Sequence, residues 1–226
     1  MNRIFMVGGG KGGVGKSTVS MALVDALMEK GEQIVLVESD DSNPDTYKAM
    51  QDLVTCEICN MDDEAGYIRL GNIIEANSKA CIVVNTAARA TAGMVQHGGI
   101  ISDVARELKR DLVMLWPINR QRDSLELLND FVENAQGYTA IYAVLNTYFG
   151  DPKKFERFYG SKLKTRITGS LEFPELNDLV ADMLIDNRWA LSYAVNASNE
   201  ALTTAERSAL GRYREAAHKA LGVAYG

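Results

Sequence analysis

Two lysines set among glycines near the amino terminus form the pattern with the clearest chemistry. The stretch Gly10-Lys11-Gly12-Gly13-Val14-Gly15-Lys16-Ser17, followed by Thr18, fits G-x-x-x-x-G-K-[ST]. Glycines let the backbone curl so that several N–H groups point inward, toward the oxygens of a polyphosphate. In such a loop Lys16 reaches the β- and γ-phosphates, the Ser17 hydroxyl ligates Mg²⁺, and Thr18 donates to the α-phosphate. The pattern therefore predicts a phosphate-binding loop.

Further polar side chains follow apolar runs that have the character of buried strands. Residues 34–37 are followed by Glu38-Ser39-Asp40-Asp41-Ser42-Asn43-Pro44-Asp45, residues 80–84 by Asn85, and residues 140–145 by Asn146. Acids at the carboxyl ends of parallel strands lie beside the ligand crevice, which favours a role for Asp40. An acidic turn is the alternative, since Asp, Ser, Asn and Pro are turn formers, and it stays open for Glu38 and Asp41.

These residues need a scaffold of strands and helices in alternation. Short apolar runs at 4–7, 34–37, 80–84, 112–115, 140–145 and 169–173 predict strands. Helical spacing lies between them at about 19–27, 97–109, 121–135 and 152–160, and the chain from Glu175 onward is predicted to be helical only. This alternation predicts an α/β fold, a mostly parallel sheet with helices on both faces, in one domain spanning residues 1–226.

The last predicted helix carries a stripe of mostly small residues. We expect its buried face to consist of Leu202, Ala205, Ala209, Tyr213, Ala216 and Ala220. Such a stripe would let the helix pack tightly on the body of the protein.

The phosphate loop resembles one family of P-loop proteins in particular. Lys11, which an ordinary P-loop lacks, resembles the first lysine of the deviant Walker A motif of ParA, MinD, the nitrogenase iron protein and arsenite-pump ATPases. The resemblance implies an ATPase that uses Mg²⁺ and dimerises when ATP is bound. It also implies that Lys11 reaches the partner's nucleotide and acts as an arginine finger does in phosphoryl transfer. An exposed loop lysine is the alternative.

The same resemblance assigns roles to the strand ends. It places Asp40 near the attacking water and Mg²⁺, and Asn146 and Pro174 around the adenine. The family usually has Asp at the Asn85 position, where it holds the water shell of Mg²⁺; the amide brings no negative charge, so slower hydrolysis or weaker Mg²⁺ binding is expected. A GTPase would have N-K-x-D after residue 145, and Thr147 and Phe149 occupy the Lys and Asp places, so guanine is disfavoured.

The Glu38–Pro44 switch segment narrows the resemblance to plasmid-borne ParA relatives of the StbB and TraL-like kind. This implies a role in plasmid stability, positioning or conjugal transfer, with a DNA-binding partner protein. Two other classes stay open. One is a nucleotide-gated scaffold with little turnover, which Asn85 favours; the other is an ATP-dependent ligase of the dethiobiotin-synthetase kind, which the lysine at Lys11 disfavours.

Composition sets limits on the remaining functions. The net charge of −6 argues against a surface that coats nucleic acid, and no run of eighteen apolar residues or signal peptide is present, so we expect a cytoplasmic protein without membrane contact. Basic and aromatic residues interleave from Lys153 to Arg166, which predicts either weak nucleic-acid binding or a solvated helix face. Cys56 and Cys59 have chelating spacing, with buried thiols as the favoured interpretation and a metal shared across a dimer as the alternative.

Overall fold

The computed structural model describes residues 2–196, 198 and 200–226, and its strands form one sheet. Every strand pairing in this sheet is parallel. The strands are β1 (Arg3–Val7), β2 (Ile34–Glu38), β3 (Thr55–Ile58), β4 (Cys81–Asn85), β5 (Asp111–Ile118), β6 (Ala140–Asn146) and β7 (Gly169–Phe173), in the order β3-β2-β4-β1-β5-β6-β7. The order reverses at β1, and ligands of open parallel sheets bind at such a switch point.

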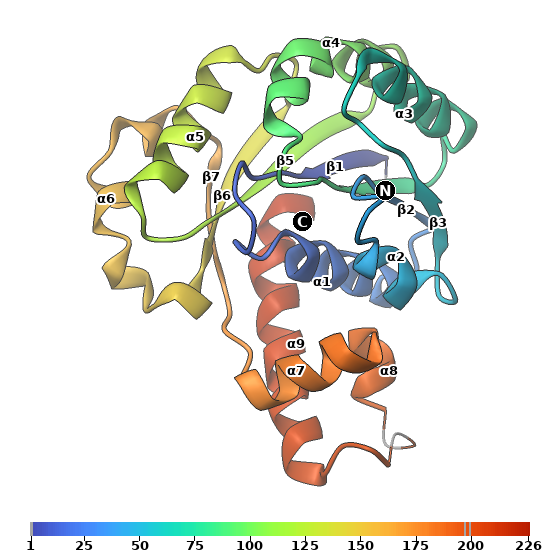
Figure 1. Ribbon diagram of the computed structural model, residues 1–226, viewed down its shortest axis with the longest axis vertical. Coiled ribbons are helices and arrows are strands. Elements are labelled where there is room, and N and C mark those ends of the chain that lie inside the picture. Colours follow the sequence, from blue (N-terminus) through green and yellow to red (C-terminus); the bar gives the residue numbers. More distant parts are fainter. Residues whose placement is uncertain (1, 197, 199) are drawn as a thin grey trace.

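Helices cover both faces of this sheet, as predicted (Figure 1). The longer ones are α1 (Lys16–Glu29), α2 (Asp45–Met50), α3 (Glu64–Ala76), α4 (Thr91–Glu107), α5 (Arg122–Asn134), α7 (Asp178–Asn187) and α9 (Thr204–Tyr225). The shorter ones are α6 (Glu156–Tyr159), α8 (Leu191–Ala194) and the 3-10 turns η1 (Thr147–Phe149), η2 (Pro152–Lys154) and η3 (Lys162–Thr165).

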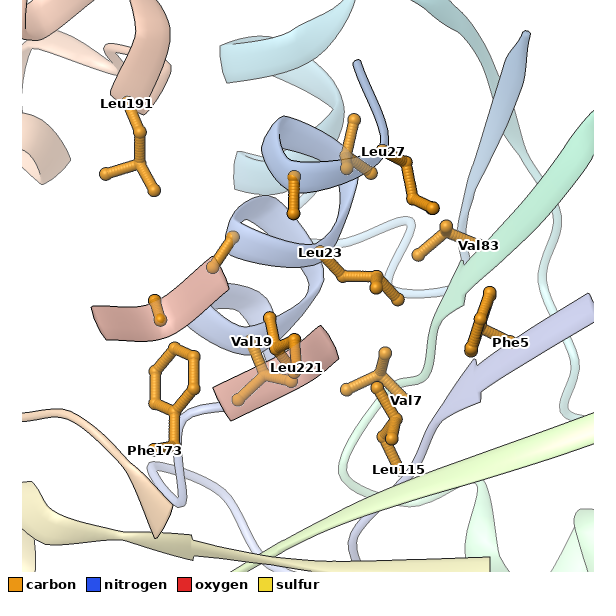
Figure 2. Packing of buried hydrophobic residues seen from close by; sticks show 14 of the residues in the cluster. Phe5, Val7, Val19, Leu23, Leu27, Val83, Leu115, Phe173, Leu191 and Leu221 are labelled. Atoms are coloured by element: carbon orange, nitrogen blue, oxygen red, sulfur yellow. The ribbon is translucent and has the colours of Figure 1, made fainter. Parts of the chain in front are cut away.

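Strand side chains alternate between two hydrophobic cores. Phe5 and Val7 of β1 belong to the core beneath α1, α8 and α9, whereas Ile4 and Met6 belong to the core beneath α3, α4 and α5. Figure 2 shows the first core, in which residues of α1 pack between the sheet and residues from α8 and α9. Helix α1 is therefore enclosed on both sides, which fixes the phosphate loop that precedes it.

An ion cluster also attaches α9 to α1. Asp25 of α1 is 1% exposed and pairs with Arg214 (Nε–Oδ2 2.5 Å) and His218 (Nε2–Oδ2 2.7 Å) of α9. The other ring nitrogen of His218 lies 2.9 Å from Glu29 Oε2. Burial alone would lower the pKa of His218, but hydrogen bonds to the two carboxylates outweigh it and raise that pKa. The imidazolium form of His218 is therefore the one that this interface favours.

The predicted strands are confirmed, and the differences lie at the sheet edge and in the helices. Edge strand β3 escaped prediction because its four residues are only half-buried or exposed and lack an apolar run. The helix predicted at about 152–160 is not continuous: it is divided at Phe155 into the turn η2, which Asp151 caps, and the single-turn helix α6, for which Gly160 is the C-cap. The predicted stripe is correct only in part: Leu202 and Tyr213 are buried, but Ala205 and Ala216 are exposed. The buried face of α9 runs instead through Leu210, Ala217, Leu221 and Ala224. Within the described residues, no helix is long and apolar enough to cross a bilayer.

Candidate nucleotide-binding site

The phosphate loop lies between β1 and α1, at the switch point of the sheet. Gly13 (φ 73°) and Gly15 (φ 100°) adopt left-handed backbone conformations that favour glycine. Helix α1 begins at Lys16 without a side-chain cap and without an acidic residue in its first turn. Its first N–H groups and its positive end are therefore directed at the loop, where they can bind an anion. A Cβ added at Gly12 or Gly13 would meet no atom of the described residues within 4 Å, so this cradle is open.

A pocket of about 350 Å³ opens in front of the loop. It brings together most of the predicted site residues. The lining residues come from the phosphate loop, from the segment after β2 and from the end of β4 with the residues that follow it. They are Gly12, Gly13, Gly15, Lys16, Ser17, Thr18, Asp40, Asn43, Asp45, Asn85, Thr86, Ala87 and Ala88. Lys16 is largely buried, which lowers the pKa of its ammonium, while the nearby carboxylates of Asp40 and Glu38 oppose this effect. Its Nζ donates to the carbonyl of Lys11 (2.8 Å), inside the curl of the loop.

The second lysine of the loop has different partners. Lys11 Nζ donates to Gln121 Oε1 (2.9 Å) and forms an ion pair with Asp123, at the start of α5. The hydrogen bond from Lys11 lowers the pKa of Asp123. Lys11 is thus directed away from the pocket that Lys16 occupies, and the two lysines do not share one task within a single chain.

A buried polar cluster lies below the pocket, between the ends of β2 and β4. The amide of Asn85 donates to both carboxylate oxygens of Glu38 (2.9 and 3.1 Å) and to Thr46 Oγ1 (3.1 Å), and its oxygen accepts from Ser20 (3.0 Å). The same amide lies 3.4 Å from Ser17 Oγ. Glu38 is 1% exposed, and burial raises the pKa of its carboxyl group. The negative charge near Ser17 therefore comes from β2, while β4 contributes a neutral hydrogen-bond donor.

Asp40 lies at the pocket wall and is held by its own loop. Its carboxylate accepts from Ser42 Oγ (2.5 Å) and from the backbone of Asn43 (3.2 Å). The hydrogen bond from Ser42 is the main reason why the pKa of Asp40 is lowered. Asp40 is therefore ionised, as a group that orients water or binds a cation must be.

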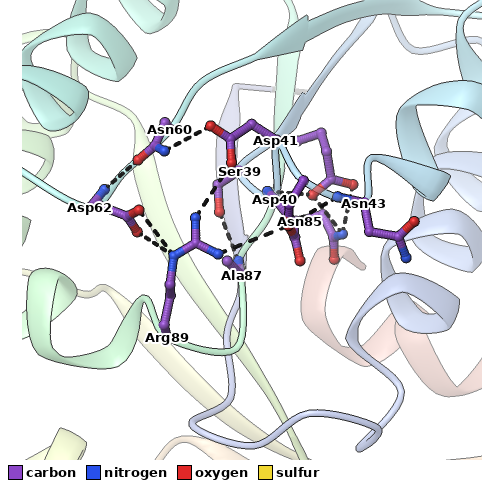
Figure 3. A network of polar contacts seen from close by, with 11 residues as sticks. Ser39, Asp40, Asp41, Asn43, Asn60, Asp62, Asn85, Ala87 and Arg89 are labelled. Atoms are coloured by element: carbon purple, nitrogen blue, oxygen red, sulfur yellow. Dashed lines mark hydrogen bonds and ion pairs between the residues drawn. The ribbon is translucent and has the colours of Figure 1, made fainter.

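Arg89, which the sequence reasoning missed, connects this acidic loop with two other segments (Figure 3). Its Nε lies 2.7 and 3.0 Å from the carboxylate oxygens of Asp62, and its terminal nitrogens lie 3.5 Å from Asp41 and 4.0 Å from Asp40. Asn60 donates to Asp41 (2.8 Å) in the same network. The segment after β4 is thereby tied to the segment after β2. An arginine four residues after a strand end is a weak signal, so only the structure identifies it.

Comparisons with known proteins agree with this geometry. Residues 5–179 match the family model described as the CobQ/CobB/MinD/ParA nucleotide binding domain. The chain belongs to this family. It is 42% identical over 222 residues to Protein MobD of Acidithiobacillus ferrooxidans, across 96% of both chains. It is also 24% identical over 242 residues to Protein TraL of Escherichia coli, across 99% of both.

Solved structures show the same fold at low identity. A putative plasmid partition protein from Borrelia burgdorferi B31 bound to AMPPNP has a TM-score of 0.55 at 18% identity, covering 97% of this chain and 99% of that chain. A nucleotide-binding protein from Archaeoglobus fulgidus in complex with ADP has a TM-score of 0.53 at 16% identity, covering 85% of this chain and 88% of that chain. The α/β fold predicted from the sequence is thus that of MinD/ParA-type P-loop proteins.

In this MinD/ParA-family protein the predicted base contacts lie at the ends of β6 and β7. Asn146 is buried, and its amide donates to the carbonyl of Val14 (3.0 Å). A Cβ on Gly15 would come within 2.5 Å of the same amide nitrogen. Asn146 therefore supports the phosphate loop from behind, a contact that the sequence did not reveal. Pro174 follows β7 and is half-buried, and its contact with a base stays a prediction.

The donor set fits Mg²⁺ bound together with a polyphosphate. Ser17 Oγ and the carboxylate of Asp40 line the same pocket, and oxygen atoms are the ligands that Mg²⁺ prefers. Asn85 does not fit a direct ligand, because its oxygen is occupied by Ser20 and its nitrogen faces Glu38. Asn85 thus supports the Glu38 carboxylate, and its contact with the water shell of Mg²⁺ stays a prediction.

Two weaker sequence signals have a structural explanation. Cys56 packs against the core under α1, whereas the fully buried Cys59 belongs to the opposite core, so the pair cannot chelate one metal. Phe155 and Phe158 are likewise buried in the core under α5, and cannot stack on bases as the interleaved pattern suggested. The lysines and arginines of that segment remain exposed.

Proposed function

We propose that this protein is a Mg²⁺-dependent ATPase whose ATP-bound form dimerises as a switch, acting in plasmid stability, partition or conjugal transfer. The observation that carries the proposal is the separate placement of two lysines in one phosphate loop. Lys16 lies inside the curl of the loop, where it would bind the phosphates of its own chain, whereas Lys11 is held at the rim of the pocket by Asp123 and Gln121. Because these partners of Lys11 can be exchanged for another anion, its ammonium group is suited to bind the γ-phosphate of the nucleotide held by a second chain.

The chain's own residues divide the proposed reaction between them. The N–H groups at the start of α1 and the ammonium of Lys16 bind the phosphates and neutralise charge. Ser17 and Asp40 would hold Mg²⁺, which supplies further positive charge to the β- and γ-phosphates. The ionised Asp40 orients the attacking water. Lys11 of the partner stabilises the charge that develops on the γ-phosphate in the transition state.

Dimerisation follows from the same charges. ATP adds a γ-phosphate at the rim, which competes with Asp123 for Lys11 of a facing chain, and ADP lacks this group. Association is therefore linked to the nucleotide state through differential affinity. ATP is proposed over GTP because Thr147 and Phe149 stand where a GTPase has its lysine and aspartate; equal affinities by calorimetry would contradict this.

Light scattering of the protein with ATP and Mg²⁺, with ADP, and without nucleotide tests the proposal. Wild type should become a dimer only with ATP. Lys16→Ala should lose nucleotide binding, whereas Lys11→Ala should bind ATP and stay monomeric, and Asp40→Ala should trap the dimer. If wild type and Lys11→Ala dimerise alike with ATP, the trans-acting lysine is refuted.

The cellular role and the partners rest on relatives. Names such as MobD, TraL and plasmid partition protein support a role in plasmid transfer or maintenance, and with it a DNA-binding adaptor protein. The exposed basic residues between Lys153 and Arg166 support a weak direct contact with DNA. Charge reversal at Lys153, Lys154 and Arg157 should remove that contact and leave ATP binding intact.

A scaffold with little turnover is the second candidate, favoured by the neutral Asn85. A turnover assay with and without DNA and a partner separates it from an ATPase, because a scaffold would not be stimulated. The ligase alternative is disfavoured by the lysine at position 11.

A further inference from the structure

A second pocket opens on the same edge of the sheet, beside the phosphate loop. Its volume is about 490 Å³, within the usual range for small-molecule sites. It lies between the segment after β5, turn η1 after β6, and helix α6. The lining residues are Asn119, Arg120, Gln121, Tyr148, Phe149 and Arg157. None of them lines the pocket in front of the phosphate loop.

The charge of this pocket favours an anion. Among the described residues, two guanidinium groups and no carboxylate line it. In the part of the chain that the structure describes, neither Arg120 nor Arg157 forms an ion pair, in contrast to Arg89, Arg166 and Arg214. Guanidinium groups without a carboxylate partner are suited to bidentate binding of a phosphate.

The loop geometry holds these arginines in place. Arg157 donates from a guanidinium nitrogen to the carbonyl of Arg120 (3.1 Å). The guanidinium of Arg120 lies against Gly150, where an added Cβ would come within 3.3 Å of Nε and 3.4 Å of Cζ. Gly150 has φ 130°, a conformation that side chains other than glycine rarely adopt. The backbone is thus shaped to let Arg120 lie across η1.

Aromatic rings add a planar surface next to these charges. Tyr148 is 56% exposed, and its ring meets that of Phe149 at 5.3 Å in an edge-on arrangement. Turn η1 is anchored from below, since Asn146 accepts from the backbone of Tyr148 (3.1 Å) and Thr147 donates to the carbonyl of Phe173 (2.9 Å). An exposed ring on an anchored turn is a platform on which a base can stack.

We propose that this pocket binds a nucleotide unit, with its phosphate on Arg120 and Arg157 and its base on Tyr148, supplied by a single-stranded nucleic acid. A free mononucleotide has the same chemistry and is the other source. A double-stranded nucleic acid would offer the phosphates but not an unstacked base. The assignment does not depend on ATP turnover, because the pocket shares no lining residue with the phosphate loop.

Fluorescence anisotropy with a labelled oligothymidine at low salt tests the proposal. Arg120→Glu/Arg157→Glu should weaken binding at least about tenfold, because two phosphate contacts are reversed in charge. The matched control Arg212→Glu/Lys219→Glu, two exposed residues of α9 outside the Lys153–Arg166 segment, has the same charge change and should weaken binding by less than about threefold. Tyr148→Ala should cost about tenfold through lost stacking, and the control Tyr159→Ala, another partly exposed tyrosine, should cost little.

Competing ligands identify the source. Displacement by unlabelled oligothymidine but not by thymidine monophosphate assigns a nucleic-acid strand, and displacement by both assigns a nucleotide pocket. Binding of a duplex as tight as the single strand and unaffected by Tyr148→Ala would overturn the proposal. Equal losses in the pocket variant and its control would also overturn it.

Binding of a fluorescent ATP analogue by the pocket variants provides the remaining check. It should match wild type, since Arg120 and Arg157 lie outside the phosphate-loop pocket. Loss of ATP binding with unchanged thermal unfolding would mean that this pocket belongs to the ATP site, and the proposal would be wrong. A failure of Lys11→Ala to block dimerisation would instead concern only the proposed ATPase switch.

Discussion

Asn85 occupies a position at which the family resemblance leads one to expect aspartate. The structure indicates that the substitution Asn85→Asp would lower the free energy of unfolding of this protein. The Asn85 amide nitrogen lies 2.9 and 3.1 Å from the two oxygens of the Glu38 carboxylate. Both residues are almost fully buried. Asn85→Asp would replace this donor by a second carboxylate at the same distance, without water to separate the two.

The magnitude follows from this distance. Two unit charges 2.9 Å apart repel by about 6 kcal/mol at an effective dielectric constant of 20. The protein can avoid part of this cost by taking up one proton. Neutralising an ordinary carboxyl group costs about 3.5 kcal/mol at pH 7 and about 1 kcal/mol at pH 5. These values are upper limits, because burial already raises the pKa of Glu38. Asn85→Asp should therefore lower the free energy of unfolding by up to about 3.5 kcal/mol at pH 7 and much less at pH 5.

Urea unfolding of wild type, Asn85→Asp, Glu38→Gln and the double variant at both pH values measures this coupling. The double variant keeps one carboxylate and one amide in the cluster with their places exchanged. It should recover most of the stability that Asn85→Asp loses, as expected for groups in direct contact. A double variant as unstable as Asn85→Asp, or a loss of equal size at pH 5 and pH 7, would refute the reasoning.

Three further perturbations address other parts of the molecule. Gly15→Ala should reduce ATP affinity at least about tenfold, because its Cβ would meet the amide of Asn146 and strain a left-handed residue; isothermal calorimetry measures it. The free energy of unfolding should fall as pH rises above about 6.5, because the pKa of His218 is higher in the folded protein than in the unfolded chain. The contribution of His218 is therefore complete below its unfolded-state pKa and is lost as pH passes its folded-state pKa. Urea titrations of wild type and His218→Gln over this pH range check this, and parallel curves of stability against pH would contradict it. Arg89→Ala should change the free energy of unfolding by less than about 1 kcal/mol, since the ion pairs of Arg89 are exposed. Hydrogen exchange of the backbone amides of residues 40–43 should nevertheless become faster. Unchanged exchange would mean that Arg89 does not hold the segment after β2 to the segment after β4.

The sequence was sufficient wherever local chemistry decides structure. A parallel strand that is buried on both faces of the sheet has apolar side chains at successive positions. The strands β1, β2 and β4 could therefore be predicted from continuous apolar runs in the sequence. The glycine and lysine spacing of residues 10–17 specified the phosphate loop, because left-handed glycines and a helix start are local requirements. The family and its fold followed from these motifs.

Tertiary structure decided whatever depends on residues distant in the chain. The pairing of Asn85 with Glu38 joins positions 47 residues apart, and Asn146 reaches Val14 across 132 residues. Lys11 meets Gln121 only because β1 and β5 are neighbours in the sheet. No propensity or period encodes such contacts, since hydrogen bonds form between whichever polar groups the strand order brings together. The sequence therefore specified which groups were available for chemistry, and packing determined which of them face the nucleotide, which support it, and which are buried in the core.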